Sequence, residues 1–450
     1  MISLLCQCKK HTFYVLLFIQ SNIKIIMKKK FLISFLILIV CHTLLAQDKN
    51  DSGNSASCVE FSNIFNNIKT LCDKDNGKLW GVNLYTPILC INKKRDLWSN
   101  QKDSQGQLQA CGEVFIGKFP VNKNIANSTI NVFGQQWVMI ALPIPVGVIN
   151  RNILFCHEIF HYWQDFLGHV PRAYNNTHMD AKDARILLKL EWNAFLSACK
   201  TTDSSLRKIA ICDALTFRKQ RQQKFSKYYS DETAFEIQEG LAQYTGIKLS
   251  VSSDSMYLHI LDKEMESYAK KENLVRSFAY FSGAIMGYLL DQSTSEWRKQ
   301  IDGNSDLGYL IQKAYGVVIP TDKEKHIQQR KALYDYNNIV RFENQRDSIQ
   351  TIKKKQLTKL FTQDIKKLPL KNMQISFDPN SIIPLENIGN IYKSVRIVDD
   401  WGILESKSNG SILITEDWKY VILPFANSIK TNNNVEETES WKLQLKASNK

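Results

Sequence analysis

No two of the 10 cysteines stand at CxxC spacing, no segment repeats along the chain, and no basic run is interleaved with aromatic residues. The missing CxxC pairs argue against a zinc site made of cysteines, and the missing repeats argue against a repeat architecture. The net charge of +14 includes six lysines in residues 1–46, a stretch without any acidic residue, which leaves +8 for the remainder. Because that charge is spread along the chain, we expect no nucleic-acid partner.

The sequence also lacks an apolar run long enough to span a membrane, and the apolar run of the leader is itself too short. From Met27 the leader reads MKKKFLISFLILIVCHTLLAQ, with three lysines, an apolar run from Phe31 to Val40, and Ala46 at the end. This is the pattern of a signal peptide cleaved after Ala46, and the run is shorter than the roughly 20 residues that span a bilayer. We expect an exported protein (periplasmic, cell-surface or secreted) without a stable membrane span, and an upstream extension at residues 1–26.

Seven cysteines remain after cleavage, and an exported protein can form disulfides. Three local pairs are possible, although the sequence does not fix the connectivity: Cys58–Cys72, Cys90–Cys111 and Cys199–Cys212. Cys156 precedes a candidate metal ligand, and we expect it to be a small buried residue rather than a nucleophile.

The hydrophobic pattern changes along the mature chain and predicts an α+β fold. Helical spacing at 58–72 is followed by short β-rich runs, including WGVNLY and QQWVMIALPIP, and later by six segments of helical periodicity. We expect a mainly helical core preceded by a small sheet and followed by a small β element. The predicted regions are a flexible segment at 47–57, a mixed region with the sheet at 58–150, a helical zinc region at 151–320, charged helices and the β element at 321–425, and a disordered polar tail at 426–450.

The chemistry is concentrated in ILFCHEIFHYWQ at residues 153–164, which contains His157-Glu158-x-x-His161. Residues four apart share one face of a helix, so both imidazoles can reach one metal ion beside Glu158. With 8 histidines, chance would give this pattern in about one of a hundred such chains. Zinc accepts nitrogen ligands and leaves a position for water, so we predict one Zn²⁺ ion with Glu158 as general base. Gln164 is expected only to pack this helix.

A catalytic zinc site needs a third protein ligand, and two later glutamates are candidates. Glu191 lies in RILLKLEWNAFLSAC and Glu239 lies in FEIQEGLAQYTG. Glu191 could instead hydrogen-bond a ligating histidine, and Glu236 is expected at the surface or beside a ligand. The Gly168-His169 pair does not have the spacing of a metzincin continuation.

The segment EGLAQY, which starts at Glu239, resembles the EGxAxY segment of aminopeptidase-N-type gluzincins, in which the glutamate completes the zinc site. YFSGA, which starts at Tyr280, is similar to their YxxGA segment, whose tyrosine hydroxyl steadies the oxyanion. The order of HExxH, EGxA and YxxGA is kept over about residues 153–292. The resemblance implies a gluzincin-type zinc metallopeptidase with His157, His161 and Glu239 as ligands, and Glu158 and Tyr280 as catalytic residues. A buried core tyrosine is the alternative reading of Tyr280.

Two departures limit this resemblance. The gap between His161 and Glu239 is 78 residues (239 − 161) and much longer than in the family, so an inserted helical hairpin at about 170–230 must return the glutamate to the metal. The family's GxMEN segment, which grips the substrate's amino group, is absent, and GQQWVMIALPIP stands in its place. Aminopeptidase specificity therefore does not carry over. We expect this apolar strand to be either a core strand or a free edge that pairs with an extended peptide.

Together these patterns predict an exported zinc metallopeptidase that hydrolyses peptide bonds of a peptide or protein substrate with a metal-activated water. The alternative is an exported zinc-containing binding or scaffold protein without peptidase activity. Exo- or endo-action and the oligomeric state are open at this point.

Overall fold

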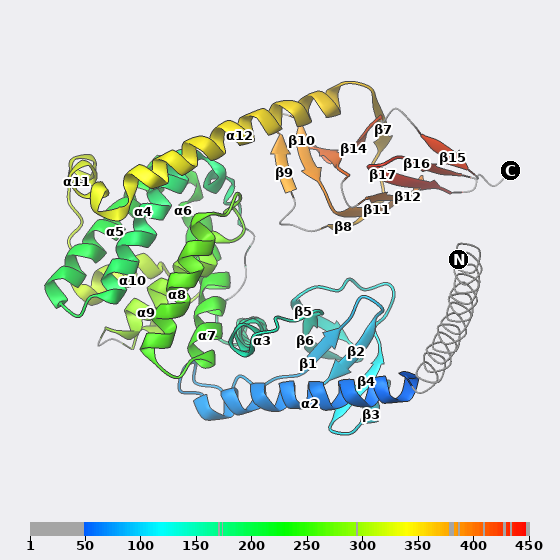
Figure 1. The fold of residues 1–450 in the computed structure, drawn as a ribbon, viewed down its shortest axis with the longest axis horizontal. Helices are drawn as coiled ribbons and strands as arrows, with labels where there is room; N and C mark the ends of the chain where they lie inside the picture. The colour runs from blue at the N-terminus through cyan, green and yellow to red at the C-terminus, as the bar shows by residue number, and fades with distance from the viewer. Residues whose placement is uncertain are drawn as a thin grey trace, which may run out of the picture.

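The computed structural model describes residues 49–169, 172, 174–293, 296–377, 382–385, 388–407, 410–425, 429–432 and 434–446. The predicted signal peptide and its cleavage site lie outside these ranges. The described chain has the predicted α+β fold: an N-terminal six-stranded mixed sheet, a central helical region, and C-terminal antiparallel sheets (Figure 1).

The N-terminal region begins with a long helix, α2 (Lys49–Asp75), which includes residues 49–57 of the segment expected to be flexible. The sheet has the order β3-β4-β2-β1-β6-β5, in which only β1 and β6 run parallel. WGVNLY forms none of its strands. The strands are β1 (Ile88–Ile91), β2 (Asp96–Ser99), β3 (Gln109–Cys111), β4 (Val114–Lys118), β5 (Ser128–Val132) and β6 (Gln135–Ala141). Because β6 lies between β1 and β5, the expectation that it offers a free edge is wrong.

The central region and the two charged helices that follow it together contain ten α-helices within the described ranges. They are α3 (Val148–Trp163), α4 (Lys182–Lys200), α5 (Ser204–Lys224), α6 (Tyr229–Phe235), α7 (Leu241–Ser250), α8 (Asp254–Ala269), α9 (Phe278–Asp291), α10 (Leu307–Tyr315), α11 (Lys323–Arg330) and α12 (Tyr336–Thr362). Their ends follow local chemistry: the Asp203 carboxylate accepts hydrogen bonds from the first backbone N–H groups of α5. Gly316 ends α10 in the left-handed conformation.

Helix α3 lies at the centre of the molecule, packed against α7 on one side and against β5 and β6 on the other. Its side chains from Phe155 to Phe160 are all buried, because other elements cover most of its surface. The close contact with α7 depends on Gly246, where a Cβ would lie 2.7 Å from the carbonyl oxygen of Ile153. A glycine here therefore brings the backbone of α7 against the helix that carries the HExxH motif.

The C-terminal β unit (residues 365–445) follows α12 and consists of two antiparallel sheets, ordered β7-β14-β13-β10-β9 and β15-β16-β17-β12-β11-β8. Burial alternates along strands such as β11, and the inward residues form a common core that includes Trp441 and Leu443. The strands are β7 (Ile365–Pro369), β8 (Gln374–Phe377), β9 (Ile382–Leu385), β10 (Gly389–Tyr392), β11 (Val395–Asp399), β12 (Gly402–Ser406), β13 (Ile412–Thr415), β14 (Tyr420–Pro424), β15 (Lys430–Asn432), β16 (Val435–Glu437) and β17 (Trp441–Leu445). The last three strands lie in the segment expected to be a disordered tail, so that expectation is wrong.

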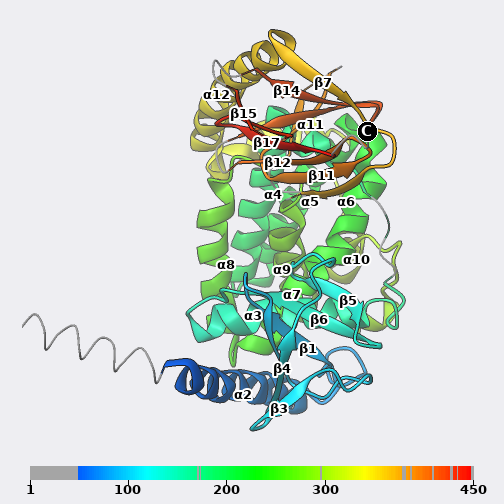
Figure 2. The ribbon, with the colours of Figure 1, turned by 90° about the vertical axis from the view of Figure 1, so that its right-hand side faces the viewer.

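The two β regions lie on the same side of the helical region, one at each end of it (Figures 1 and 2). Strand β8 of the C-terminal β unit and strand β5 of the N-terminal sheet are the strands nearest to the space between them (Figure 1). Among the described residues, no helix is long and apolar enough to cross a membrane.

Candidate metal centre and its cleft

Three side chains from two separate segments converge beside α3. The Nε2 atoms of His157 and His161 lie 3.1 Å apart. The Oε2 atom of Glu239 lies 3.3 Å from the first and 3.4 Å from the second. This is a group that can hold one metal ion, and its ligand atoms all lie within 4.8 Å of one another.

The size of this triangle fits a tetrahedral site. Zinc bonds to histidine nitrogen and carboxylate oxygen of about 2.0–2.1 Å place neighbouring ligand atoms of a tetrahedron about 3.3 Å apart. The three distances between the ligand atoms are 3.1, 3.3 and 3.4 Å. An ion with such bond lengths therefore fits this triangle without rearrangement of the ligands.

The charges of the group also favour a cation. Burial works against a charged His161, but Glu239 and Glu158 raise its pKa to about 9. Burial would also raise the pKa of Glu239, yet hydrogen bonds to His157 and His161 hold it well below its usual range. The site therefore stabilises positive charge at the point where the three ligand atoms meet.

Two glutamines orient the imidazoles through their other ring nitrogens. Nδ1 of His157 lies 3.2 Å from Oε1 of Gln243, and Nδ1 of His161 lies 2.7 Å from Oε1 of Gln164. An amide oxygen can only accept, so each Nδ1 carries a proton, and each Nε2 is the ring nitrogen left to bind a metal ion in place of its own proton. The sequence suggested only a packing role for Gln164, and this contact with His161 shows a further one. Gln243 lies in the EGLAQY segment, but nothing in that pattern indicated its contact.

The amide groups of these glutamines are fixed in turn. Nε2 of Gln243 donates to Glu264 at 2.6 Å, and Nε2 of Gln164 donates to the backbone oxygen of Gln238 at 2.8 Å. Burial raises the pKa of Glu264 to about 7. The orientation of His157 therefore depends on α7 and α8, and that of His161 depends on the turn that carries Glu239.

Glu239 stands on a π-helical turn, Glu236–Gly240, between α6 and α7. Short π-helical segments often occur at functional sites. Glu236, three residues earlier, is fully buried and pairs with Arg218 of α5 through contacts of 2.7 and 2.5 Å, so the expectation of a surface position is wrong. This ion pair fixes the turn to the hairpin formed by α4 and α5, which lies in the long gap between His161 and Glu239.

Glu191, the other candidate ligand, lies on α4 in the same buried network. It pairs with Arg218 at 3.1 Å and also with Arg221, and it is fully buried. Arg221 in turn pairs with Glu232, which accepts a hydrogen bond from His178. Within the described residues, the group suited to a metal contains Glu239 and not Glu191.

The glycines of the EGLAQY and YFSGA segments contact each other. A Cβ on Gly283 would lie 2.1 Å from the Cα of Gly240, and a Cβ on Gly240 would lie 2.8 Å from the Cα of Gly283. Only two glycines permit this approach of α9 to the π-helical turn. Since Glu239 precedes Gly240 and Tyr280 is one turn before Gly283, the contact sets the position of both side chains.

The two predicted catalytic residues lie beside the ligand triangle. The ring of Tyr280 stacks on that of His157, with centroids 5.2 Å apart. Burial, followed by the charge of Glu239, raises the pKa of the Tyr280 hydroxyl, so this group remains a hydrogen-bond donor. Glu158 is 7% exposed, and burial raises its pKa. Its carboxylate lines the adjoining cavity, and no hydrogen-bond partner for it is found among the described residues.

A comparison of the chain with protein-family models, curated protein sequences and solved structures found no match. The functional evidence therefore comes from the geometry of the site itself, a largely buried His157–His161–Glu239 group that can hold one metal ion.

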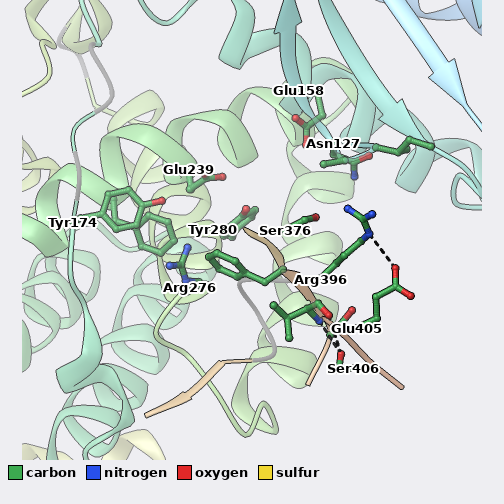
Figure 3. Close-up of a pocket in the computed structure, with 16 residues that line it drawn as sticks. Asn127, Glu158, Tyr174, Glu239, Arg276, Tyr280, Ser376, Arg396, Glu405 and Ser406 are labelled. Carbon is green, nitrogen blue, oxygen red and sulfur yellow. Dashed lines mark hydrogen bonds and ion pairs between the residues drawn. The ribbon is translucent and has the colours of Figure 1, made fainter. Parts of the chain in front are cut away.

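The metal group opens onto a cavity of about 830 Å³ that lies between the helical region and the C-terminal β unit. Figure 3 shows its walls: Glu239 and Tyr280 face the space from one side, Glu158 and Asn127 from a second, and Ser376 of β8 from a third. The sequence motifs did not predict that the C-terminal β unit lines this cavity, because this depends on how elements far apart in the sequence pack together.

The cysteines differ from the expected local pairs. The disulfide joins Cys58 to Cys111 and links α2 to β3, whereas Cys72, Cys90, Cys199 and Cys212 are free. The three suggested pairs are therefore wrong. Cys156 is fully buried, and burial raises the pKa of its thiol well above the usual value, so it is unsuited to act as a nucleophile. A disulfide is typical of an oxidising compartment.

Proposed function

We propose that the protein is an exported, gluzincin-type zinc metallopeptidase, with one Zn²⁺ ion bound by His157, His161 and Glu239. The observation that carries this proposal is the triangle of ligand atoms with edges of 3.1–3.4 Å, open to the cavity that Glu158 and Tyr280 line. Two histidines and a glutamate are a ligand set of catalytic zinc sites, which keep a fourth position for water. The leader and the Cys58–Cys111 disulfide support export.

The bound ion would lower the pKa of a coordinated water and polarise the scissile carbonyl. The carboxylate of Glu158, adjacent in sequence to His157, accepts the proton of that water and later gives it to the leaving amine. Burial raises the pKa of this carboxylate, which makes it a stronger proton acceptor than an exposed glutamate. The neutral hydroxyl of Tyr280 donates a hydrogen bond to the oxygen of the scissile carbonyl as negative charge develops there.

The Glu158→Gln variant tests this assignment. It keeps the size and the three metal ligands but cannot accept a proton, so zinc content should stay at one ion per chain. Hydrolysis of a peptide library should fall by about 10²–10⁴-fold, the usual contribution of a general base. The control is Glu60→Gln, an exposed glutamate of α2 outside the cleft.

Near-normal turnover by Glu158→Gln would rule out the role of Glu158 as base. Zinc in the wild-type protein without hydrolysis of any peptide would favour a zinc-containing binding or scaffold protein instead.

A further inference from the structure

The metal group lies between two cavities. The first, described above, extends from the group toward the C-terminal β unit. The second, of about 1070 Å³, runs along α3 and α8 and is lined by His157 and Lys263 among others. Both are lined by Asn127, Glu158 and Tyr280. The reacting groups therefore stand at the junction of two cavities and not at the end of one.

The cavity on the side of the C-terminal β unit continues further. A third cavity of about 480 Å³ is lined by Trp418 and Tyr392, and it shares Tyr174, Arg276 and Phe377 with the first. The rings of Tyr392 and Trp418 lie edge to face, with centroids 6.4 Å apart. The third, aromatic cavity therefore adjoins the first, and it also shares Lys271 with the second. Together the three cavities form a continuous path beside the metal group.

One wall of this path is a sheet edge. Ser376 and Phe377 of β8 line the first cavity together with residues of β11 and β12, and among the described strands β8 is the last in its sheet, paired with β11 alone. The backbone groups on the free side of an edge strand can pair with an extended peptide. A polypeptide in strand conformation therefore matches the shape of this path better than a compact ligand does.

Most carboxylates that line the three cavities have other roles. Glu239 is a proposed metal ligand and Glu158 the proposed base; Glu405 pairs with Arg396, Asp180 pairs with Arg346, and one oxygen of Glu264 accepts from Gln243. The other oxygen of Glu264 is buried without a partner in the described part of the chain and is the one lining carboxylate oxygen left for a substrate's amino group, but the second cavity continues past it along α8, from His259 to Lys271. On the other side, Arg276 could meet a free carboxylate, but the path continues past it into the third cavity.

We propose that the protein is an endopeptidase that binds an extended stretch of polypeptide across the metal, with one side of the substrate held by β8 and the aromatic cavity of the C-terminal β unit. The inference rests on the proposed peptidase function and adds the substrate class: internal bonds of extended chains, with an apolar or aromatic side chain in the third cavity.

The first test uses the zinc-loaded protein and peptides of about twelve residues, which span about 40 Å when extended. One set is acetylated and amidated so that both ends are blocked, and a matched set has free ends. We expect the blocked peptides to be cut at internal bonds into two fragments. Cleavage of free-ended peptides alone, with loss of one terminal residue, would overturn endo-action and leave the peptidase function standing. If no peptide of either set is cleaved, the proposed function fails, and this inference fails with it.

The second test addresses the C-terminal β unit. Trp418→Ala removes a partly exposed aromatic from the third cavity, and Phe425→Ala removes one from the same unit that lines none of the three cavities. Trp418→Ala should raise KM for the twelve-residue peptides about three- to tenfold and leave kcat unchanged. This factor corresponds to the binding free energy of one aromatic contact. Peptides of about four residues, too short to span the path, should show no change, and neither should Phe425→Ala. Unchanged KM for the long peptides, or equal effects of both variants, would overturn this role.

Discussion

At the scale of single residues, the site is defined as much by its glutamines as by its metal ligands. A histidine ligand has two ring nitrogens, and the partner of one decides which nitrogen is free to bind a metal. Gln243 and Gln164 supply these partners for His157 and His161. Both glutamines are held by further hydrogen bonds, so the imidazoles are oriented before any ion binds.

This arrangement leads to a prediction about metal affinity. Gln243→Ala should weaken zinc binding by about 10- to 100-fold, the usual effect of removing such a partner, because His157 loses the acceptor that fixes its ring and its protonated nitrogen. The measurement is a competition titration of the metal-free protein against a zinc chelator. Gln292→Ala, an exposed glutamine at the end of α9, is the control and should bind zinc as the wild type does. A Gln243→Ala variant with wild-type affinity would refute the orienting role.

The sequence reaches only part of this residue-level description. His157 and His161 could be found because four-residue spacing places them on one helix face. Glu239 could be singled out from its EGLAQY context, but the choice between it and Glu191 depends on the tertiary fold. Glu191 lies opposite Arg218 and Arg221, and no local pattern reveals which of two buried glutamates faces arginines and which faces histidines.

At the scale of elements, the site depends on close approaches between helices. Gly246 lets α7 lie against α3, and the Gly240–Gly283 contact lets α9 lie against the π-helical turn. These contacts join the three motif segments into one unit. A glycine within a helix lowers helix stability by about 1 kcal/mol relative to alanine. The close contact between helices that each glycine permits explains why glycine occupies these positions.

Gly283→Ala tests this account. The added Cβ would meet the backbone of Gly240 at 2.1 Å, which no side-chain rotation can relieve. Overpacking of this kind typically costs about 1–3 kcal/mol, and the displaced turn should also lower zinc affinity because it carries Glu239. Unfolding in urea and a zinc titration measure the two effects.

The matched control is Gly147→Ala at the start of α3, where a Cβ would meet only the Asn150 side chain, at 3.7 Å. Its loss of stability should stay below about 1 kcal/mol, without a change in zinc affinity. If the two variants behave alike, the glycine contact does not position the turn.

The elements themselves were predictable wherever the hydrophobic period was regular. The helices from α3 to α9 and the sheet strand β6 lie where the pattern placed them. Two expectations failed for physical reasons. The 426–450 segment is rich in polar residues, yet Trp441 and Leu443 alternate into the core of the C-terminal β unit, so three short strands form. The pairing of β6 with β1 as well as β5 depends on a partner about 50 residues away.

At the scale of the whole molecule, the two β regions stand at either end of the helical region, on its same side (Figure 1). Helix α12 packs along α4 and reaches β14, and the Arg185–Glu343 pair joins α12 to α4 at 2.7 Å. The C-terminal β unit is therefore attached to the same helical hairpin that fixes Glu236. The proposed substrate path and the turn that carries Glu239 therefore share one support.

The Cys58–Cys111 disulfide closes a long loop of the chain at the opposite end of the molecule, with a sequence separation of 53. In the chain-entropy model a loop of this length stabilises the folded state by about 4 kcal/mol. Replacing both cysteines by serine should lower the free energy of unfolding by roughly that amount, as measured by equilibrium unfolding in urea. Cys212→Ser, which alters a free and partly exposed cysteine, should change it by less than about 1 kcal/mol.

Neither Cys58 nor Cys111 lines any of the three cavities, so the folded double variant should keep its zinc and its hydrolytic rate. A loss of zinc in the folded double variant would instead mean that α2 helps to hold α3 and α7 in place at the metal.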